Sequence, residues 1–277
     1  MDLPQGFNVP ATDGQARSTL WTKGFCFDLC RSSVDKRSYM RLIQETKNIL
    51  QTNIKIKDLG EVRFFLGIEF SRSSEGILMH QRKYALEINS YSGLGGTKTV
   101  GAPVEVIQKL TSVIFDQHVH SQHDTVLNDS GSYQRLVGRL LYLSVTRTDI
   151  SFAIQNLSQF IHSPKQSHME AATRVVKYIK QALGKGILMS STVSSKLQAY
   201  CDADMGSCLT TRKSVSRYAV NIGDSLISWK SKKYSTISRS SVESEYRSLV
   251  STVVEVVWLI GLFKELGLSI RFPVDTS

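Results

Sequence analysis

The sequence predicts an α+β fold, with strands and helices in separate blocks along the chain rather than in regular alternation. A strand-rich segment comes first, at 62–81, and helical periodicity dominates 133–183. A hairpin pattern at 217–229 then precedes a long helical pattern at 242–266. With 277 residues, 41% of them apolar, the chain is long enough for at least two units that each bury a core.

The chain is basic, with 34 Lys and Arg against 24 Asp and Glu and a formal net charge of +10. These cations are spread along the chain rather than gathered in one tail. Distributed cations favour a polyanionic partner such as nucleic acid, because they release counterions from phosphates. A solvated basic surface is the alternative.

The cysteines indicate a reducing, intracellular location, either cytoplasm or nucleus. They lack the spacing of a zinc site and have no histidine pair beside them, so free thiols are expected. The most apolar stretch, 253–263, contains Glu255 and is too short to span a bilayer, so no membrane partner is expected. The four cysteines are Cys26, Cys30, Cys201 and Cys208.

The first third of the chain predicts a loop, a helix and a β-hairpin. Residues 1–34 have weak periodicity and several Pro and Gly residues, which indicates an extended start. Apolar residues recur at helical spacing over 35–50. Two strands follow, at 62–70 and 77–81, joined by a polar turn.

A helix over 81–91 ends at a group of glycines, and 97–131 shows no regular pattern. This irregular segment contains three histidines beside Asp116 and Asp124. A metal cluster is conceivable there, but we expect a solvated loop, because the spacing fixes no geometry. The histidines are His118, His120 and His123.

Three helices are predicted next, at 133–146, 149–161 and 168–183, followed by a strand at 187–195. Cations one or two turns apart on packed helices can follow a phosphate backbone, although each alone is more often a surface residue. The block is therefore a candidate duplex clamp. Its candidate cations are Arg135, Arg139, Arg147, Lys177 and Lys180.

A second unit is predicted from residue 196. A strand at 197–203 precedes a hairpin whose strands, 217–222 and 226–229, are joined through Gly223 and Asp224. Lys232 and Lys233 add a basic run after it and are further candidates for contacts with nucleic acid. The long helix 242–266 is expected to turn an apolar face to the core, made of Val242, Tyr246, Leu249, Val250, Val253 and Val257.

Carboxylates at the end of a strand and at the start of a helix suggest a site for Mg²⁺, which prefers oxygen ligands. Asp202 and Asp204 end the strand, and Glu243 and Glu245 begin the helix. Helical spacing does not decide between the two glutamates, since they flank the expected core face on opposite sides.

Ordered motifs across the chain resemble copia-type retrotransposon Pol polyproteins, at the end of the reverse transcriptase and the start of its ribonuclease H domain. The opening, Met1 to Phe7, also looks like the fingers region of that family. The matching motifs are Asp58-Leu59-Gly60, Phe65-Leu66-Gly67-Ile68-Glu69, Tyr133-Gln134-Arg135-Leu136-Val137-Gly138, Thr146-Arg147-Thr148-Asp149-Ile150-Ser151, Cys201-Asp202-Ala203-Asp204 and Ser240-Ser241-Val242-Glu243-Ser244-Glu245-Tyr246.

This resemblance implies three parts. Residues 1–34 are similar to a fingers and palm remnant, and 35–195 to the palm end, a primer-gripping hairpin, thumb and connection. Residues 196–277 resemble an incomplete ribonuclease H-like α/β domain, which in the family cleaves RNA in RNA–DNA hybrids with two Mg²⁺ ions. Asp202 and Glu245 would be its metal ligands and catalytic residues, and Asp204 either takes no part or lies outside the metal ligands.

The sequence departs from the family at several positions. No Tyr-x-Asp-Asp motif occurs, so polymerase activity is expected to be absent. The chain reaches Ser277 about where the strand with a third carboxylate begins, and Asp275 falls early for that role. Met205, Arg217 and Thr148 stand where the family has Trp, Gly and Pro.

Three functional readings remain. The chain resembles a metal-dependent nuclease joined to reverse-transcriptase remnants. The alternative, which we favour, is a non-catalytic remnant that binds RNA–DNA hybrid or other nucleic acid. A basic protein with some other interaction role is a third reading.

Overall fold

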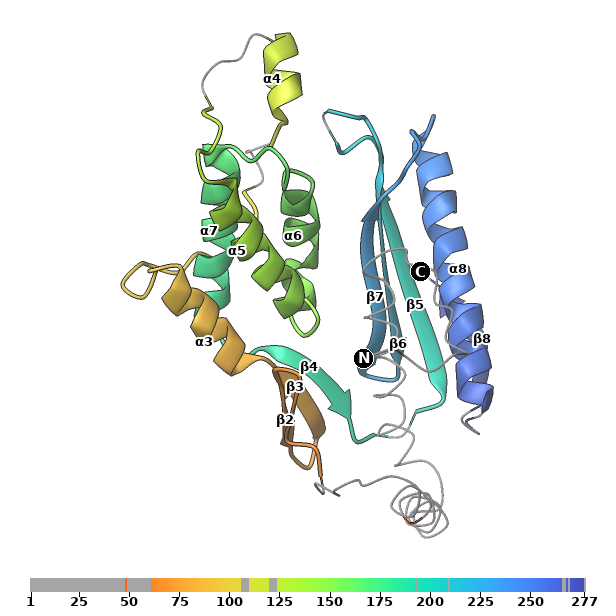
Figure 1. The fold of residues 1–277 in the computed structure, drawn as a ribbon. Coiled ribbons are helices and arrows are strands. Elements are labelled where there is room, and N and C mark those ends of the chain that lie inside the picture. The colour runs from red at the N-terminus through yellow and green to blue at the C-terminus, as the bar shows by residue number, and fades with distance from the viewer. Residues whose placement is uncertain are drawn as a thin grey trace.

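A computed structural model describes residues 48, 61–105, 110–119, 124–192, 194–208, 210–265, 268 and 270–276. The predicted loop at 1–34 lies outside the described residues. So does the predicted helix at 35–50, apart from Asn48, which is helical. Figure 1 shows a group of helices and a small sheet on one side, and a second sheet with a long helix on the other.

The small sheet has four antiparallel strands in chain order. The single strand expected over 62–70 is in fact two strands, because Leu66 and Gly67 adopt positive φ angles of 46° and 78°. Such a pair makes the tight turn that suits a two-residue hairpin. The strands are β1 (Phe64–Phe65), β2 (Ile68–Arg72), β3 (Gly76–His80) and β4 (Gly186–Ser190).

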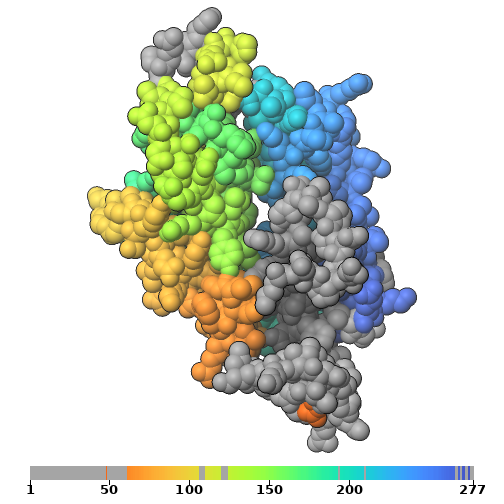
Figure 2. Space-filling model, viewed as in Figure 1, coloured from red at the N-terminus to blue at the C-terminus, as the bar shows by residue number. Residues whose placement is uncertain are grey.

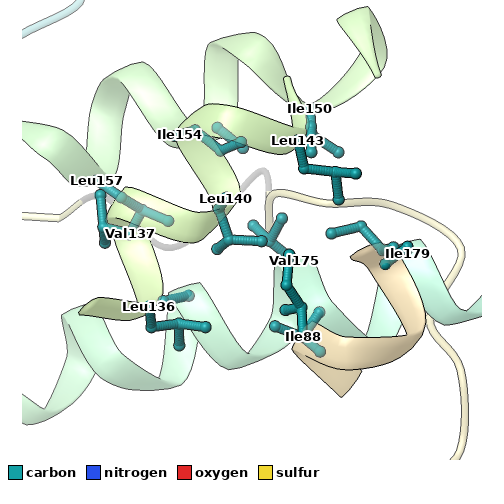
Figure 3. Packing of buried hydrophobic residues seen from close by; sticks show 14 of the residues in the cluster. Ile88, Leu136, Val137, Leu140, Leu143, Ile150, Ile154, Leu157, Val175 and Ile179 are labelled. Atoms are coloured by element: carbon teal, nitrogen blue, oxygen red, sulfur yellow. The ribbon is translucent and has the colours of Figure 1, made fainter. Parts of the chain in front are cut away.

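The helices bury one apolar core between α3, α5, α6 and α7 (Figure 3). Asp129 caps α5 by accepting hydrogen bonds from the backbone amides of Gly131 and Ser132. The segment 97–131, predicted as a loop, contains the short helix α4. The elements are α3 (Arg82–Tyr91), α4 (Val113–Val119), α5 (Ser130–Leu143), the 3₁₀ turn η2 (Thr148–Ile150), α6 (Ser151–Ser158) and α7 (Gln166–Gln181).

The second sheet has the strand order β7-β6-β5-β8, with β8 parallel to β5 and the other pairs antiparallel. The predicted turn at Gly223 and Asp224 is confirmed, since Ile222 pairs with Ser225 across it. Helix α8 makes the crossover between the antiparallel block and β8. The elements are β5 (Lys196–Asp204), β6 (Val215–Ile222), β7 (Ser225–Lys233), α8 (Ser241–Glu265) and β8 (Arg271–Thr276).

The predicted core face of α8 is wrong. The face that packs on the sheet is formed by Ser244, Ser248, Thr252, Val256, Leu259 and Phe263. Val242 and Val257, both expected in the core, are 75% and 63% exposed. The helix lies so close to β5 that Ser248 Oγ donates to the Asp202 carbonyl oxygen at 3.0 Å, and only small side chains fit at that distance.

Helix α8 is 25 residues long, much longer than the apolar stretch 253–263, and its best 18-residue window has a mean hydropathy of 1.5. By length and composition alone it could cross a membrane. One of its faces packs against the second sheet.

The two parts of the described chain touch along β4, α6 and β7. Ser190 donates its backbone amide to Ser225 Oγ at 2.9 Å, and Leu226 and Trp229 of β7 pack against the small sheet. In the space-filling view the helices and the second sheet abut (Figure 2). The boundary predicted at residue 196 separates β4 from β5, which belong to different sheets.

Candidate nucleic-acid interface and strand-end carboxylates

Asp202 and Asp204 lie at the end of β5 on the sheet face that turns away from α8. Side chains alternate along a strand. Leu197 and Ala199 pack in the core beneath α8, so the even-numbered residues point to the other side. The Asp202 and Asp204 side chains are 60% and 49% exposed.

Arg217 lies directly opposite Asp202, on β6. Its Nη1 is 3.6 Å from Asp202 Oδ2, and its Nη2 donates to Asp204 Oδ2. The guanidinium also lies over the ring of Phe152 in α6, 4.7 Å from the ring centre. A protein cation therefore already occupies the position that a metal would need.

The two candidate glutamates of α8 differ in their surroundings. Glu243 accepts from the Arg239 backbone amide at 2.7 Å and pairs with Arg247 at 2.6 Å. Glu245 is exposed. The hydrogen bond from Ser248 to the Asp202 carbonyl brings the start of α8 to the same end of the sheet as Asp202. Which glutamate would act as a ligand stays a prediction.

Asp275 lies on β8, but its position along the sheet is too far from Asp202 for it to serve as a third ligand. Its backbone pairs with Gln198, four residues before Asp202 along β5. Four residues of strand span about 13 Å. Within the described part of the chain, no three His, Cys, Asp or Glu residues gather to hold a metal. This arrangement does not fit the Mg²⁺ that the resemblance implies, because Mg²⁺ needs several oxygen ligands without a competing cation.

Arg135 is the exposed member of the predicted clamp on the helices, and Arg139 beside it is partly buried. They lie one turn apart on α5 and meet Tyr91 at the end of α3. Arg139 lies over the Tyr91 ring, 3.9 Å from its centre, while Arg135 Nε donates to the Tyr91 hydroxyl at 3.2 Å. The side chain of Arg135 is 59% exposed, and Tyr91 is 46% exposed. We call these three residues the Arg–Tyr cluster.

Arg147 is not a surface residue. It is only 2% exposed, and its guanidinium binds both carboxylate oxygens of Asp149, at 2.9 and 3.0 Å, and the Ala182 carbonyl at 2.8 Å. Although burial by itself would raise the pKa of Asp149, Arg147, Tyr178 and Lys185 lower this pKa to about 2. The prediction that Arg147 contacts nucleic acid does not fit this arrangement.

The remaining predicted cations are dispersed. Lys180 Nζ donates to three backbone carbonyls after α3, those of Leu94, Gly95 and Thr97, so it holds that turn. Lys177 is half-buried on α7. On β7, Lys232 is exposed, whereas Lys233 Nζ donates to Gln159 Oε1 of α6 at 2.6 Å.

Two features of the site were not found from the sequence. Tyr91 was assigned only to the end of a helix, and nothing in the local pattern links it to arginines more than 40 residues later. Arg217 was noticed only as a departure from a family pattern. Its position opposite Asp202 depends on strand register, which a hairpin turn predicts for β6 and β7 but not for β5.

Comparison with known proteins decides the family. The chain is 35% identical over 232 residues to the retrovirus-related Pol polyprotein from transposon RE2 of Arabidopsis thaliana, which covers 84% of the chain and 15% of that protein. It is 29% identical to the corresponding polyprotein from transposon TNT 1-94 of Nicotiana tabacum, over 82% of the chain and 17% of that protein. The chain belongs to the copia-type retrotransposon Pol polyproteins.

A shorter relative is similar over most of its own length. The uncharacterized mitochondrial protein AtMg00810 of Arabidopsis thaliana is 34% identical over 76% of the chain and 83% of that protein. Compared with the full-length Pol polyproteins, this chain spans about 15% of their length. No family model matches the chain, and no solved structure matches it significantly.

Proposed function

We propose that this Pol segment binds RNA–DNA hybrid through the Arg–Tyr cluster and does not itself cleave the hybrid. The observation that carries the proposal is the exposed Arg135 and the partly buried Arg139 beside it, both held against Tyr91. Arginines one helical turn apart can contact neighbouring phosphates, and their contact with an aromatic ring fixes their positions before binding.

The overall charge supports the same partner. A net charge of +10 attracts polyanions over the whole surface, while the cluster supplies one defined contact. The similarity of the β1–β3 segment to a primer-gripping hairpin, and of the helices to a thumb, favours a hybrid duplex. Arg147 and Lys180 are excluded from the proposed surface because their side chains bind other parts of the chain.

Absence of cleavage is proposed from the strand-end carboxylates. Asp202 and Asp204 are paired with Arg217, and Asp275 is about four residues away along the strand. Polymerisation is a separate activity, and we propose that it is absent too, because the sequence lacks the Tyr-x-Asp-Asp motif on which it depends in the family.

A ribonuclease H-like nuclease is the second candidate. It is favoured by the sheet order β7-β6-β5-β8, in which α8 leads to a strand parallel to β5, together with the carboxylates of β5 and α8. Incubating the protein with labelled RNA–DNA hybrid and Mg²⁺ separates the two candidates. Cleavage of the RNA strand that disappears in Asp202→Asn would establish the nuclease and overturn our proposal.

Binding is tested with the same hybrid at fixed salt. We expect Arg135→Ala to weaken binding, and Arg135→Ala with Arg139→Ala to weaken it further. Lys264→Ala, which removes an exposed charge at the end of α8, is the matched control and should leave the affinity nearly unchanged. Equal losses in Arg135→Ala and Lys264→Ala would show that only net charge matters and that the cluster is no site.

A further inference from the structure

We propose that Arg217 is a built-in cation that pairs with both Asp202 and Asp204, offsets part of their charge and weakens the binding of divalent cations at this end of β5. The inference deepens the proposed absence of cleavage, which rests on the same ion pairs, but it is independent of hybrid binding through the Arg–Tyr cluster, because its test uses a metal alone.

Strand register brings Arg217 to the carboxylates. Asp202 and Arg217 are directly opposite each other in the β5–β6 ladder, so their side chains leave the sheet on the same face. Asp204 is two residues further along and shares that face. One guanidinium can donate through both of its outer nitrogens, and here Nη1 faces Asp202 while Nη2 binds Asp204.

Helix α6 holds the guanidinium from the other side. The ring of Phe152 lies 4.7 Å from the guanidinium carbon, so the cation lies between the ring and the two carboxylates, with 37% of its side chain exposed. Arg217 Nε is buried and has no hydrogen-bond partner within the described residues. The two carboxylates and the ring, and not a bond at Nε, therefore fix the orientation of the guanidinium.

This arrangement opposes metal binding in two ways. The guanidinium approaches the Oδ2 atom of each carboxylate, and it has no lone pair with which to coordinate a metal itself. A divalent cation brought to the same carboxylates would also be repelled by the positive charge at close range. Metal binding at these carboxylates must therefore compete with Arg217.

The test is a titration of the full chain with Mn²⁺, in which free Mn²⁺ is measured by electron paramagnetic resonance. We expect Arg217→Gly to bind Mn²⁺ at least tenfold more tightly than the unmodified chain. Adding Asp202→Asn to Arg217→Gly should abolish the gain. Arg217→Gln, which keeps a long side chain over Phe152 without the charge, should show the same gain if the glycine variant does not fold.

The matched control is Arg212→Gly, which removes one charge from the nearby loop. Arg212 is exposed, and its positive φ of 53° suits glycine. An equal gain in Arg212→Gly would show a general charge effect and overturn the proposal. So would tight Mn²⁺ binding by the unmodified chain, or a gain in Arg217→Gly that persists with Asp202→Asn.

Discussion

Lys165 is buried at the start of α7, with 2% of its surface exposed, although lysine rarely occupies such positions. Its ammonium group pairs with Asp116 and lies 3.0 Å from Asp124 Oδ2 and 3.1 Å from Thr111 Oγ1. These contacts tie the segment around α4 to α7. The sequence prediction of a solvated loop was wrong here, because the cation that anchors these aspartates is about 40 residues later in the chain.

His168 belongs to the same buried cluster and should make stability depend on pH. Burial, and then the charge of Lys165, lower its pKa to about 4, although the hydrogen bond to the Thr111 carbonyl opposes this shift. The folded chain therefore keeps His168 neutral at pH values where the unfolded chain binds a proton. Stability should fall as the pH drops from 6.5 to 4, by on the order of 3 kcal/mol in total.

Urea unfolding at several pH values measures this effect. The slope of stability against pH in this window should be smaller in His168→Gln than in the unmodified chain, whatever the absolute stability of the variant. Burial raises the pKa values of Asp116 and Asp124, but hydrogen bonds from Lys165, Thr111 and Ser167 outweigh burial and lower both below 3.8, so the stability lost on their protonation falls at the acid end of this window and below it. An unchanged slope would mean that His168 has the same pKa in the folded chain as in the unfolded chain.

Arg147 gives a prediction that separates a structural role from a binding role. Arg147→Met removes the two hydrogen bonds that Arg147 donates to the largely buried Asp149. Removing one partner of a buried ion pair lowers the free energy of unfolding by about 3 kcal/mol or more. Thermal unfolding should therefore shift strongly downward. At temperatures where the variant is folded, its hybrid affinity should match that of the unmodified chain, and a selective loss of affinity would contradict the buried role.

At the scale of elements, α8 shows where hydrophobic periodicity misleads. The predicted face was chosen because Val and Tyr are apolar, but the helix turns Ser244, Ser248 and Thr252 toward the sheet. Close approach of helix and strand requires small side chains, and their hydroxyls remain satisfied by backbone carbonyls, as for Ser248 and Thr252. The pattern of apolar residues in the sequence does not show how closely a helix approaches a sheet.

Two alanine substitutions on α8 test which face is buried. Leu259 is fully buried, so Leu259→Ala should destabilise the chain by about 2–5 kcal/mol. Val257 is 63% exposed, so Val257→Ala should change stability by no more than about 0.5 kcal/mol. Chemical denaturation measures both. A larger loss of stability for Val257→Ala than for Leu259→Ala would show that the face expected from the sequence, and not the one described here, is buried.

At the scale of the whole molecule, the sequence predicted the order and type of most elements but not their long-range partners. The three helices after residue 130 and the hairpin β6–β7 follow from local periodicity and a turn at Gly223. The pairing of β4 with β3 joins segments about 100 residues apart, and no local pattern encodes it. The same limit applies to the candidate site, since Asp202 was found by its motif and its partner Arg217 only by register.

The central claim is that this Pol segment holds a nucleic-acid duplex by its cations, with the Arg–Tyr cluster as a defined contact. The most direct measurement is the affinity for RNA–DNA hybrid as a function of salt. The logarithm of the association constant should fall linearly with the logarithm of salt concentration, and replacing both Arg135 and Arg139 with alanine should lower the slope by about 2. An affinity that barely changes with salt, or a slope that is the same in the double variant, would contradict the account.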